Sequence, residues 1–276
     1  VIVFVGCDIQ SFAIPSNVLI IASNAFEGTN IDHIFIPPHV TKICKKAFAN
    51  CSQLRMIEIP PDSKLRTIGK NAFSMTPIEK IFIPCHVTKM GSEAFYFCDN
   101  LEHIEIPDDS ELQSFEPFLF TCSGVKSVTI PPIFCEFKEC WSFSADVLKK
   151  VSIHQKNRYF KNHENLIVGK SDVNNDECDV LIFAYRNIIR VTIPPNIKVI
   201  TSNAFQGTLI ESIFIPSSVT KICRGAFDCC SHLERIELAP DSKLQVIERH
   251  AFKNTSIKSF VIPPLVIFVE AEAFAF

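Results

Sequence analysis

The sequence predicts a solenoid of about eleven stacked coils, each 22–25 residues long and each contributing one short parallel strand. Two periodic signals support this fold class. An Ala-Phe dipeptide recurs in two blocks with spacings of 22, 25 and 22 residues, its aromatic members being Phe26, Phe48, Phe73, Phe95, Phe205, Phe227, Phe252 and Phe274. An Ile-Pro dipeptide recurs beside it, at Ile14, Ile36, Ile59, Ile83, Ile106, Ile130, Ile193, Ile215 and Ile262. A unit of roughly 23 residues cannot bury its own apolar face, so such units must stack.

The residues before each Ile-Pro pair predict the strand. Leu101, Ile104 and Ile106 show the pattern L-x-x-I-x-I-P most clearly. Apolar residues at every second position are typical of a strand with one buried face. The proline ends the strand because it has no N–H to donate. The rest of the unit, V-x-x-I-x-x-x-A-F, carries each Phe at a fixed phase, which predicts that these rings fill the shared core.

The sequence also contains a longer repeat that spans several coils. Residues 1–97 align without gaps with residues 180–276, and Val40–Cys44 recurs unchanged as Val219–Cys223. Val1–Val5 aligns with Val180–Ala184, so the chain opens in the middle of a unit. Terminal repeats of solenoids normally carry a polar cap, and neither end has that composition. We therefore expect a single solenoid over residues 1–276 that is truncated at both ends.

One segment breaks the period. The step from Ile153 to Ile193 is longer than a normal coil by about seventeen residues. Leu166–Val168 and Val180–Phe183 have the composition of two strands, and the polar stretch 169–179 between them has that of a loop. We predict an inserted antiparallel β-hairpin over residues 154–187 that projects from the solenoid.

The complete unit, L-x-x-I-x-I-P followed by V-x-x-I-x-x-x-A-F-x-x-C, resembles the BspA-like leucine-rich repeats found in surface antigens of mucosal bacteria and protozoan parasites. The segment Asn157–Ala184 is similar to a hairpin that recurs in such proteins. The resemblance implies a leucine-rich-repeat solenoid of the right-handed β/α superhelix type. It also implies a cell-surface or extracellular protein that binds host or matrix proteins. The pairs Leu119-Phe120 and Ser142-Phe143 depart from the pattern.

Composition excludes several classes of function. The chain has 27 basic and 30 acidic residues, a formal charge of −3, so it lacks the basic surface that nucleic-acid binding needs. No apolar run approaches the roughly 20 residues of a membrane span. We therefore expect neither a nucleic-acid partner nor a membrane-spanning segment.

Among the twelve cysteines, Cys51, Cys98 and Cys230 share one phase of the coil and Cys44 and Cys223 another, which predicts small buried packing residues rather than a disulfide scaffold. Cys98 and Cys122 lie on adjacent coils, so a disulfide between them stays open as an alternative. No C-x-x-C pair is present, and we expect no zinc. Asp172, Asn174, Asp176 and Asp179 are spaced somewhat like a calcium loop, but Glu177 stands where that loop needs Gly, which favours an exposed turn.

No constellation of catalytic residues is visible. The eight histidines are scattered, and the 8 glycines form no phosphate-binding loop. We expect no enzyme activity, no cofactor and no metal. Two glycosylation sequons, at Asn50 and Asn254, leave glycosylation undecided.

The residue between the last two apolar positions of each strand should point away from the core, towards a concave strand face. Aromatic, acidic and basic residues in and beside these positions are the candidate ligand-binding set: Phe35, Glu58, Phe82, Glu105, Lys126, Lys149, Lys150, Arg190, Phe214 and Glu237. Exposed Phe beside charged residues is typical of a protein-binding surface. The alternative is that these Phe side chains only cover one another. The four basic members suggest an acidic ligand near the middle of the face, and a solvated charged face is the alternative.

Two functions follow. The first is a non-enzymatic protein-binding module, a cell-surface antigen or adhesin that engages host-cell or matrix proteins through the strand face. The second is an intracellular or structural repeat scaffold for protein–protein interaction, with a cytoplasmic location. Cysteines at buried phases are compatible with both.

Overall fold

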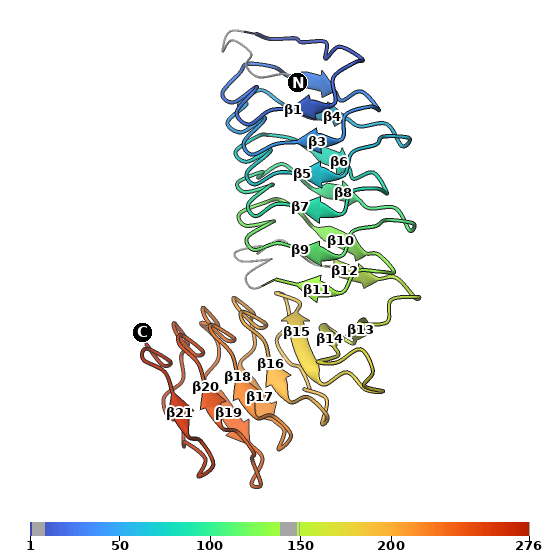
Figure 1. The fold of residues 1–276 in the computed structure, drawn as a ribbon. Helices are drawn as coiled ribbons and strands as arrows, with labels where there is room; N and C mark the ends of the chain where they lie inside the picture. Colours follow the sequence, from blue (N-terminus) through green and yellow to red (C-terminus); the bar gives the residue numbers. More distant parts are fainter. Residues whose placement is uncertain (2–8, 139–147, 149, 276) are drawn as a thin grey trace. The chain divides into compact units, whose positions relative to one another are not determined.

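The computed structural model describes residues 1, 9–138, 148 and 150–275. The chain forms two compact units, Val1–Arg158 (unit 1) and Tyr159–Phe276 (unit 2), and each is a stack of short-stranded coils (Figure 1). The predicted leucine-rich-repeat type of solenoid is confirmed within the units. That one solenoid continues through residues 1–276 stays a prediction.

In unit 1 the residues before the Ile-Pro pairs form one parallel sheet, which we call the Ile-Pro sheet. Its order is β12-β10-β8-β6-β4-β2. The middle residue of each three-residue strand, such as Ile34 or Ile57, is buried, while its neighbours point outward. The strands are β2 (His33–Phe35), β4 (Met56–Glu58), β6 (Lys80–Phe82), β8 (His103–Glu105), β10 (Ser127–Ile130) and β12 (Lys150–Ile153).

Each coil of unit 1 from β1 to β11 also carries a second strand, which the sequence analysis did not predict. These strands fall on the V-x-x-I segment, where an outward polar residue precedes an inward apolar one, as in Lys42 and Ile43. They form a four-stranded parallel sheet, β1-β3-β5-β7, and a two-stranded one, β11-β9. The strands are β1 (Ile20–Ile21), β3 (Lys42–Ile43), β5 (Thr67–Ile68), β7 (Lys89–Met90), β9 (Ser114–Phe115) and β11 (Glu136–Phe137). The coil core therefore lies between two rows of strands.

The Ala-Phe segments form turns and not the helices that a β/α superhelix implies. No helix occurs among the described residues. The residue before each Ala has a positive φ, as in Asn24 and Asn71, and among the described residues so does the one two positions after each Phe, as in Gly28 and Asn50. Two left-handed residues within six positions are incompatible with an α-helix. Asparagine and glycine tolerate this conformation best, which explains their recurrence here.

The predicted burial of the Phe rings is confirmed except for Phe274, which is half-buried, and the rings form a stack within each unit. In unit 1, Phe26, Phe48 and Phe73 are fully buried, with ring centroids 4.9 and 5.5 Å apart and nearly parallel planes. In unit 2, Phe205 and Phe227 stack at 4.8 Å. The backbone reinforces the stack, because Phe N–H groups donate to carbonyls of the next coil, 2.8 Å from Phe26 to Ala47 and 3.2 Å from Phe95 to Leu119. Successive coils are thus joined by aromatic contacts as well as by strand pairing.

Threonine and cysteine alternate three residues after the Phe, at a buried position. The hydroxyl of Thr76 donates to the Phe73 carbonyl at 2.6 Å. On the next coil, the Cys98 thiol donates to the same carbonyl at 3.1 Å. The pair Thr208 and Cys230 repeats this arrangement in unit 2. Cys98 is a free thiol, so the alternative disulfide with Cys122 is wrong.

Burial makes these thiols weak acids, which predicts low reactivity. Burial raises the pKa of Cys98 to about 12 and that of Cys230 to about 11, since the apolar surroundings disfavour the thiolate. Alkylation requires the thiolate, so iodoacetamide at pH 8 should modify exposed Cys135 and Cys229 at least about a hundredfold faster than Cys98. Peptide mass spectrometry measures the rates. Equal rates for Cys98 and Cys135 in the folded chain would show that Cys98 is not buried.

Unit 2 begins with three antiparallel strands that continue into its coils. Its larger sheet has the order β13-β14-β15-β16-β18-β20-β21, and β17 pairs with β19 in a separate two-stranded sheet. The strands are β13 (Phe160–His163), β14 (Leu166–Gly169), β15 (Val180–Ala184), β16 (Val199–Ile200), β17 (Ser212–Ile215), β18 (Lys221–Ile222), β19 (Arg235–Leu238), β20 (Val246–Ile247) and β21 (Phe268–Val269).

The inserted segment differs from the expected projecting hairpin in two respects. β14 pairs antiparallel with β15, but it also pairs antiparallel with β13, so three strands are present rather than two. β15 then pairs parallel with β16, through Val180 with Val199 and Leu181 with Ile200. The segment is therefore the first layer of unit 2. The reason is its apolar content, since Leu166, Ile167 and Leu181 are fully buried.

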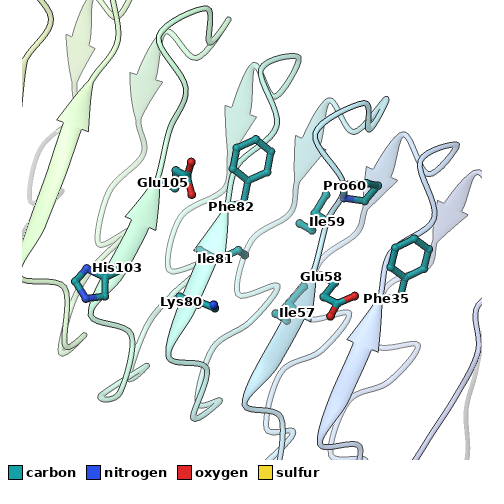
Figure 2. Close-up of a pocket in the computed structure, with 10 residues that line it drawn as sticks. All are labelled: Phe35, Ile57, Glu58, Ile59, Pro60, Lys80, Ile81, Phe82, His103 and Glu105. Carbon is teal, nitrogen blue, oxygen red and sulfur yellow. The ribbon is translucent and has the colours of Figure 1, made fainter.

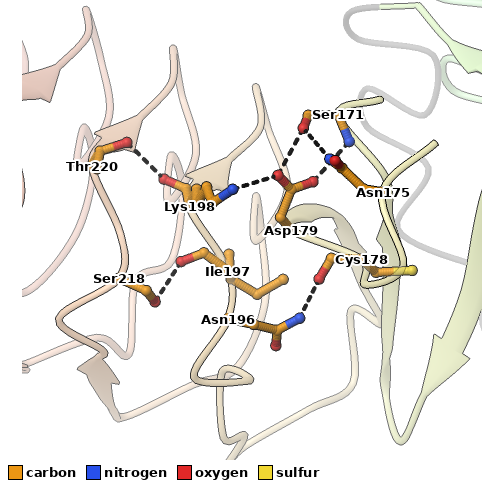
Figure 3. Close-up of polar contacts among 9 residues, drawn as sticks. All are labelled: Ser171, Asn175, Cys178, Asp179, Asn196, Ile197, Lys198, Ser218 and Thr220. Atoms are coloured by element: carbon orange, nitrogen blue, oxygen red, sulfur yellow. Dashed lines mark hydrogen bonds and ion pairs between the residues drawn. The ribbon is translucent and has the colours of Figure 1, made fainter. Parts of the chain in front are cut away.

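The loop between β14 and β15 is held by a buried carboxylate (Figure 3). The Asp179 side chain is 7% exposed, and it accepts hydrogen bonds from the Ser171 N–H at 2.8 Å and the Ser171 hydroxyl at 2.7 Å. Lys198 donates to it at 3.2 Å, and Asn196 donates to the neighbouring Cys178 carbonyl at 2.6 Å. These bonds tie the loop to the first coil of unit 2.

We expect Asp179→Asn to destabilise unit 2 by about 2 kcal/mol at pH 7, because charged hydrogen bonds are lost. Burial opposes ionisation, but the bonds from Ser171 and Lys198 outweigh it, so the pKa of Asp179 is lowered. The carboxylate therefore stabilises the fold above its unfolded pKa of about 3.9, and this stabilisation is lost as the pH falls through the lower folded value. Urea unfolding at pH 7 and pH 3 measures the difference. A difference as large at pH 3 as at pH 7 would contradict the assignment.

Candidate functional site

Two rows of side chains point outward from the Ile-Pro sheet of unit 1, and we call this surface the ladder face. Residues of a row occupy equivalent positions on successive strands, about 4.8 Å apart. One row is His33, Met56, Lys80, His103, Ser127 and Lys150, and the other is Phe35, Glu58, Phe82, Glu105, Thr129 and Ser152. The second row alternates aromatic and acidic residues because the two coil types alternate. Figure 2 shows this alternation over four neighbouring strands.

The ladder face is hollowed between its two Phe side chains. The hollow has a volume of about 450 Å³, and Phe35 and Phe82 stand on either side of Glu58 (Figure 2). Phe35 is 44% exposed although its neighbours on the strand are well packed. The floor is apolar and comes from the buried isoleucines of β4 and β6, while Glu105, Lys80 and His103 complete the rim. A second hollow of about 520 Å³ adjoins it through Lys80 and His103.

Carboxylates outnumber cations around these two hollows. Their lining residues include one lysine and five carboxylates, the latter being Glu58, Glu105, Glu79, Asp99 and Glu102. Glu58 lies 3.5 Å from His33, and Glu102 lies 2.5 Å from Lys126. Glu105 makes no ion pair within the part of unit 1 that the structure describes. Lys126 offsets the charge of Glu102, but the other four carboxylates still outnumber Lys80, so the hollows keep a negative bias.

The same positions differ in unit 2. Phe214 on β17 lies opposite Glu237 on β19, as Phe35 lies opposite Glu58 in unit 1. Arg235, however, pairs with Glu237 at 3.1 Å, and Val261 stands at the position equivalent to Phe82. A hollow of about 330 Å³ lies here too, but no charged residue lines it. The duplicated coils thus carry two chemically different faces.

Comparison with known protein families shows which family the chain belongs to. The family model for the BspA type leucine rich repeat region matches residues 2–101, 62–166 and 176–276. The chain belongs to this family. The predicted resemblance is therefore confirmed, including its assignment as a leucine-rich repeat protein.

Solved structures of leucine-rich repeat proteins share the fold of this BspA-type chain. The pneumococcal vaccine antigen PcpA is 23% identical, with a TM-score of 0.82 over 95% of this chain and 68% of its own. A leucine rich cell surface protein from Faecalibacterium prausnitzii is 21% identical, with a TM-score of 0.67 over 99% and 78%. A leucine-rich repeat protein from Eubacterium ventriosum is 18% identical, with a TM-score of 0.62 over 89% and 82%. A search of curated protein sequences found no significant match.

The predicted site residues fall into separate groups in this BspA-type chain. Phe35, Glu58, Phe82 and Glu105 come together on the ladder face, with Lys150 exposed further along the same sheet on β12. Phe214 and Glu237 are opposite each other in unit 2. Arg190 also belongs to unit 2, where it is exposed outside any strand. Lys149 lies outside the described residues.

The acidic-ligand hypothesis loses one of its supports. It relied on a run of basic residues near the middle of the face. Lys126 is already paired with Glu102, and this pair also lowers the pKa of the Glu102 carboxyl through a hydrogen bond and the lysine charge. The sequence could not show this pairing, because the partner is on the preceding coil.

The described residues hold no group of three His, Cys, Asp or Glu side chains arranged to bind a metal ion. In the stretch compared with a calcium loop, Asp172 accepts bonds from Asn174, and Asp179 is occupied by Ser171 and Lys198. Within the described part of the chain, no helix has the length and apolar character to cross a membrane.

Sequence reasoning missed two contributors to the ladder face. Met56 is 43% exposed and lies beside the hollow, in the row of Lys80 and His103. Asp99 lines the adjoining hollow from the turn before β8. The position before the central isoleucine of each strand was the available signal for Met56, since residues two apart in a strand share a face.

Proposed function

We propose that this BspA-type chain is a protein-binding module that acts through the ladder face of its Ile-Pro sheet. The observation that carries the proposal is the exposed Phe35 at the edge of an apolar-floored hollow, with charged residues around it. Exposed aromatic side chains beside a polar rim are a recurrent composition of protein interfaces. A rigid sheet also limits the conformational entropy lost on binding.

We further propose a cell-surface or extracellular location and an adhesive role towards host-cell or matrix proteins. The family and the surface proteins among the structural neighbours support this proposal. The alternative is an intracellular scaffold with a protein partner of another kind. It is supported by the buried, unpaired thiols Cys51, Cys98 and Cys230, which suit a reducing compartment equally well. Both alternatives are non-enzymatic, in keeping with a family of repeat proteins.

Binding of the folded chain to a panel of matrix proteins and to intact epithelial cells tests the proposal. A variant carrying Phe35→Ser and Phe82→Ser serves as the comparison, with circular dichroism as the control for folding. We expect saturable binding by the native chain and its loss in the variant. Absence of binding to every member of the panel would contradict the adhesive role. Equal binding by the folded variant would contradict the ladder face as the binding surface.

A further inference from the structure

We infer that the hollow between Phe35 and Phe82 is a subsite for a lysine or arginine side chain carried by an extended segment of a partner protein. The inference rests on the proposed function and names the partner chemistry of the same face. It follows from two features of unit 1: two aromatic walls and carboxylates at the rim.

The walls provide the first part of the recognition. Phe35 and Phe82 are two strands apart, roughly 10 Å, with Glu58 on the strand between them, so a partner side chain would lie over Glu58 with one ring on each side (Figure 2). A long aliphatic stem can pack on the isoleucine floor while its cationic head meets the ring faces. Each ring can make a cation–π contact with such a head group. A carboxylate side chain in the same place would meet the repulsive faces of the same rings.

The rim provides the second part. Glu58 lies between the two rings, so a cation held there is close to this carboxylate, and Glu105 lies on the next strand beyond Phe82 (Figure 2). The adjoining hollow adds Glu79 and Asp99, which extends the negative surface along the strands. Lys80 is the one basic residue at the rim apart from histidine, and it opposes a basic ligand.

The internal duplication supplies the comparison that singles out unit 1. In unit 2 the equivalent of Phe82 is Val261, so one aromatic wall is missing. The equivalent of Glu58 is Glu237, and its charge is already matched by Arg235 at 3.1 Å. The common fold does not require the aromatic and acidic pattern, because unit 2 keeps the coil without it. The pattern of unit 1 is therefore a property of its surface.

Fluorescence anisotropy with a labelled peptide of alternating arginine and serine tests the inference, since alternate side chains of an extended peptide face the sheet. A peptide of alternating glutamate and serine is the control probe. We expect saturable binding of the arginine peptide alone. Glu58→Gln, Glu105→Gln and Phe82→Leu should each weaken it about two- to fivefold, as expected for exposed ion pairs and cation–π contacts. Lys80→Met should strengthen it by a similar factor, and added salt should weaken it.

Matched variants in unit 2 make the test specific. Glu237→Gln repeats Glu58→Gln at the equivalent position, Phe214→Leu changes the equivalent of Phe35, and both should leave peptide affinity unchanged. Equal losses of peptide affinity from the variants of both units would show that the peptide is held by non-specific charge attraction, which would overturn the inference. Tighter binding of the glutamate peptide would also overturn it. If a panel protein binds through Phe35 and Phe82 while the arginine peptide does not bind, the proposed function stands and the basic-side-chain subsite is wrong.

Discussion

Replacing Phe73 or Phe227 by alanine is expected to lower the free energy of unfolding by about 3–5 kcal/mol. Both rings are fully buried, and each is stacked between the rings of the coils on either side. Truncation leaves a cavity that two neighbouring coils share, so neither can close it without losing its own strand pairing. Urea unfolding of the wild type and the two variants measures the loss.

Exposed phenylalanines in the same units are the matched controls. Phe35 is 44% exposed and Phe214 is 50% exposed, so alanine at either position should cost less than about 1 kcal/mol. Similar losses for Phe73→Ala and Phe35→Ala would contradict the division into an inner stack and an outer ladder face.

Replacing Arg186 by methionine is the second large effect, with an expected loss of about 3 kcal/mol. Arg186 is 7% exposed, and its guanidinium donates to the carbonyls of Ala204 and Asn203 at 3.1 and 3.3 Å. It also lies 4.4 Å above the ring of Phe183. Methionine fills much of the same volume but leaves the buried carbonyls without these donors. The change to methionine therefore separates the contribution of the hydrogen bonds to stability from the contribution of packing.

Arg224→Met in the same unit is the control, because the Arg224 side chain is exposed and should contribute less than about 0.5 kcal/mol. Hydrogen exchange of unit 2 amides reports both variants. Unchanged protection in Arg186→Met would show that the buried guanidinium does not stabilise unit 2.

The coil architecture could be predicted because the residues that repeat in every coil each have a single physical role. A Phe that returns every 22 or 25 positions must sit at one depth, and Phe73 and Phe227 do. The alternation of Phe35, Glu58, Phe82 and Glu105 could be predicted for the same reason, since residues between two inward isoleucines must point outward.

The remaining features depend on contacts between coils, which a period does not specify. The second strand occupies only two residues of the V-x-x-I segment, and two residues are too few to show an alternating pattern. The left-handed residues of the turns include Lys46, Glu93 and Phe97, which carry no sequence signal for that conformation. Arg186 stands in a segment that has the composition of a loop, and its burial follows from carbonyls contributed by the next coil.

Hydroxyl-radical footprinting of the chain bound to its tightest panel partner tests the central claim most directly. The two exposed methionines of unit 1 are internal reporters: Met56, 43% exposed, lies on the ladder face, and Met75, 50% exposed, lies on an Ala-Phe turn. Buried Met90 should stay unoxidised throughout. We predict that the partner protects Met56 from oxidation and leaves Met75 unchanged. Protection of Met75 with continued oxidation of Met56 would place the binding surface on the turns and contradict the assignment of the ladder face.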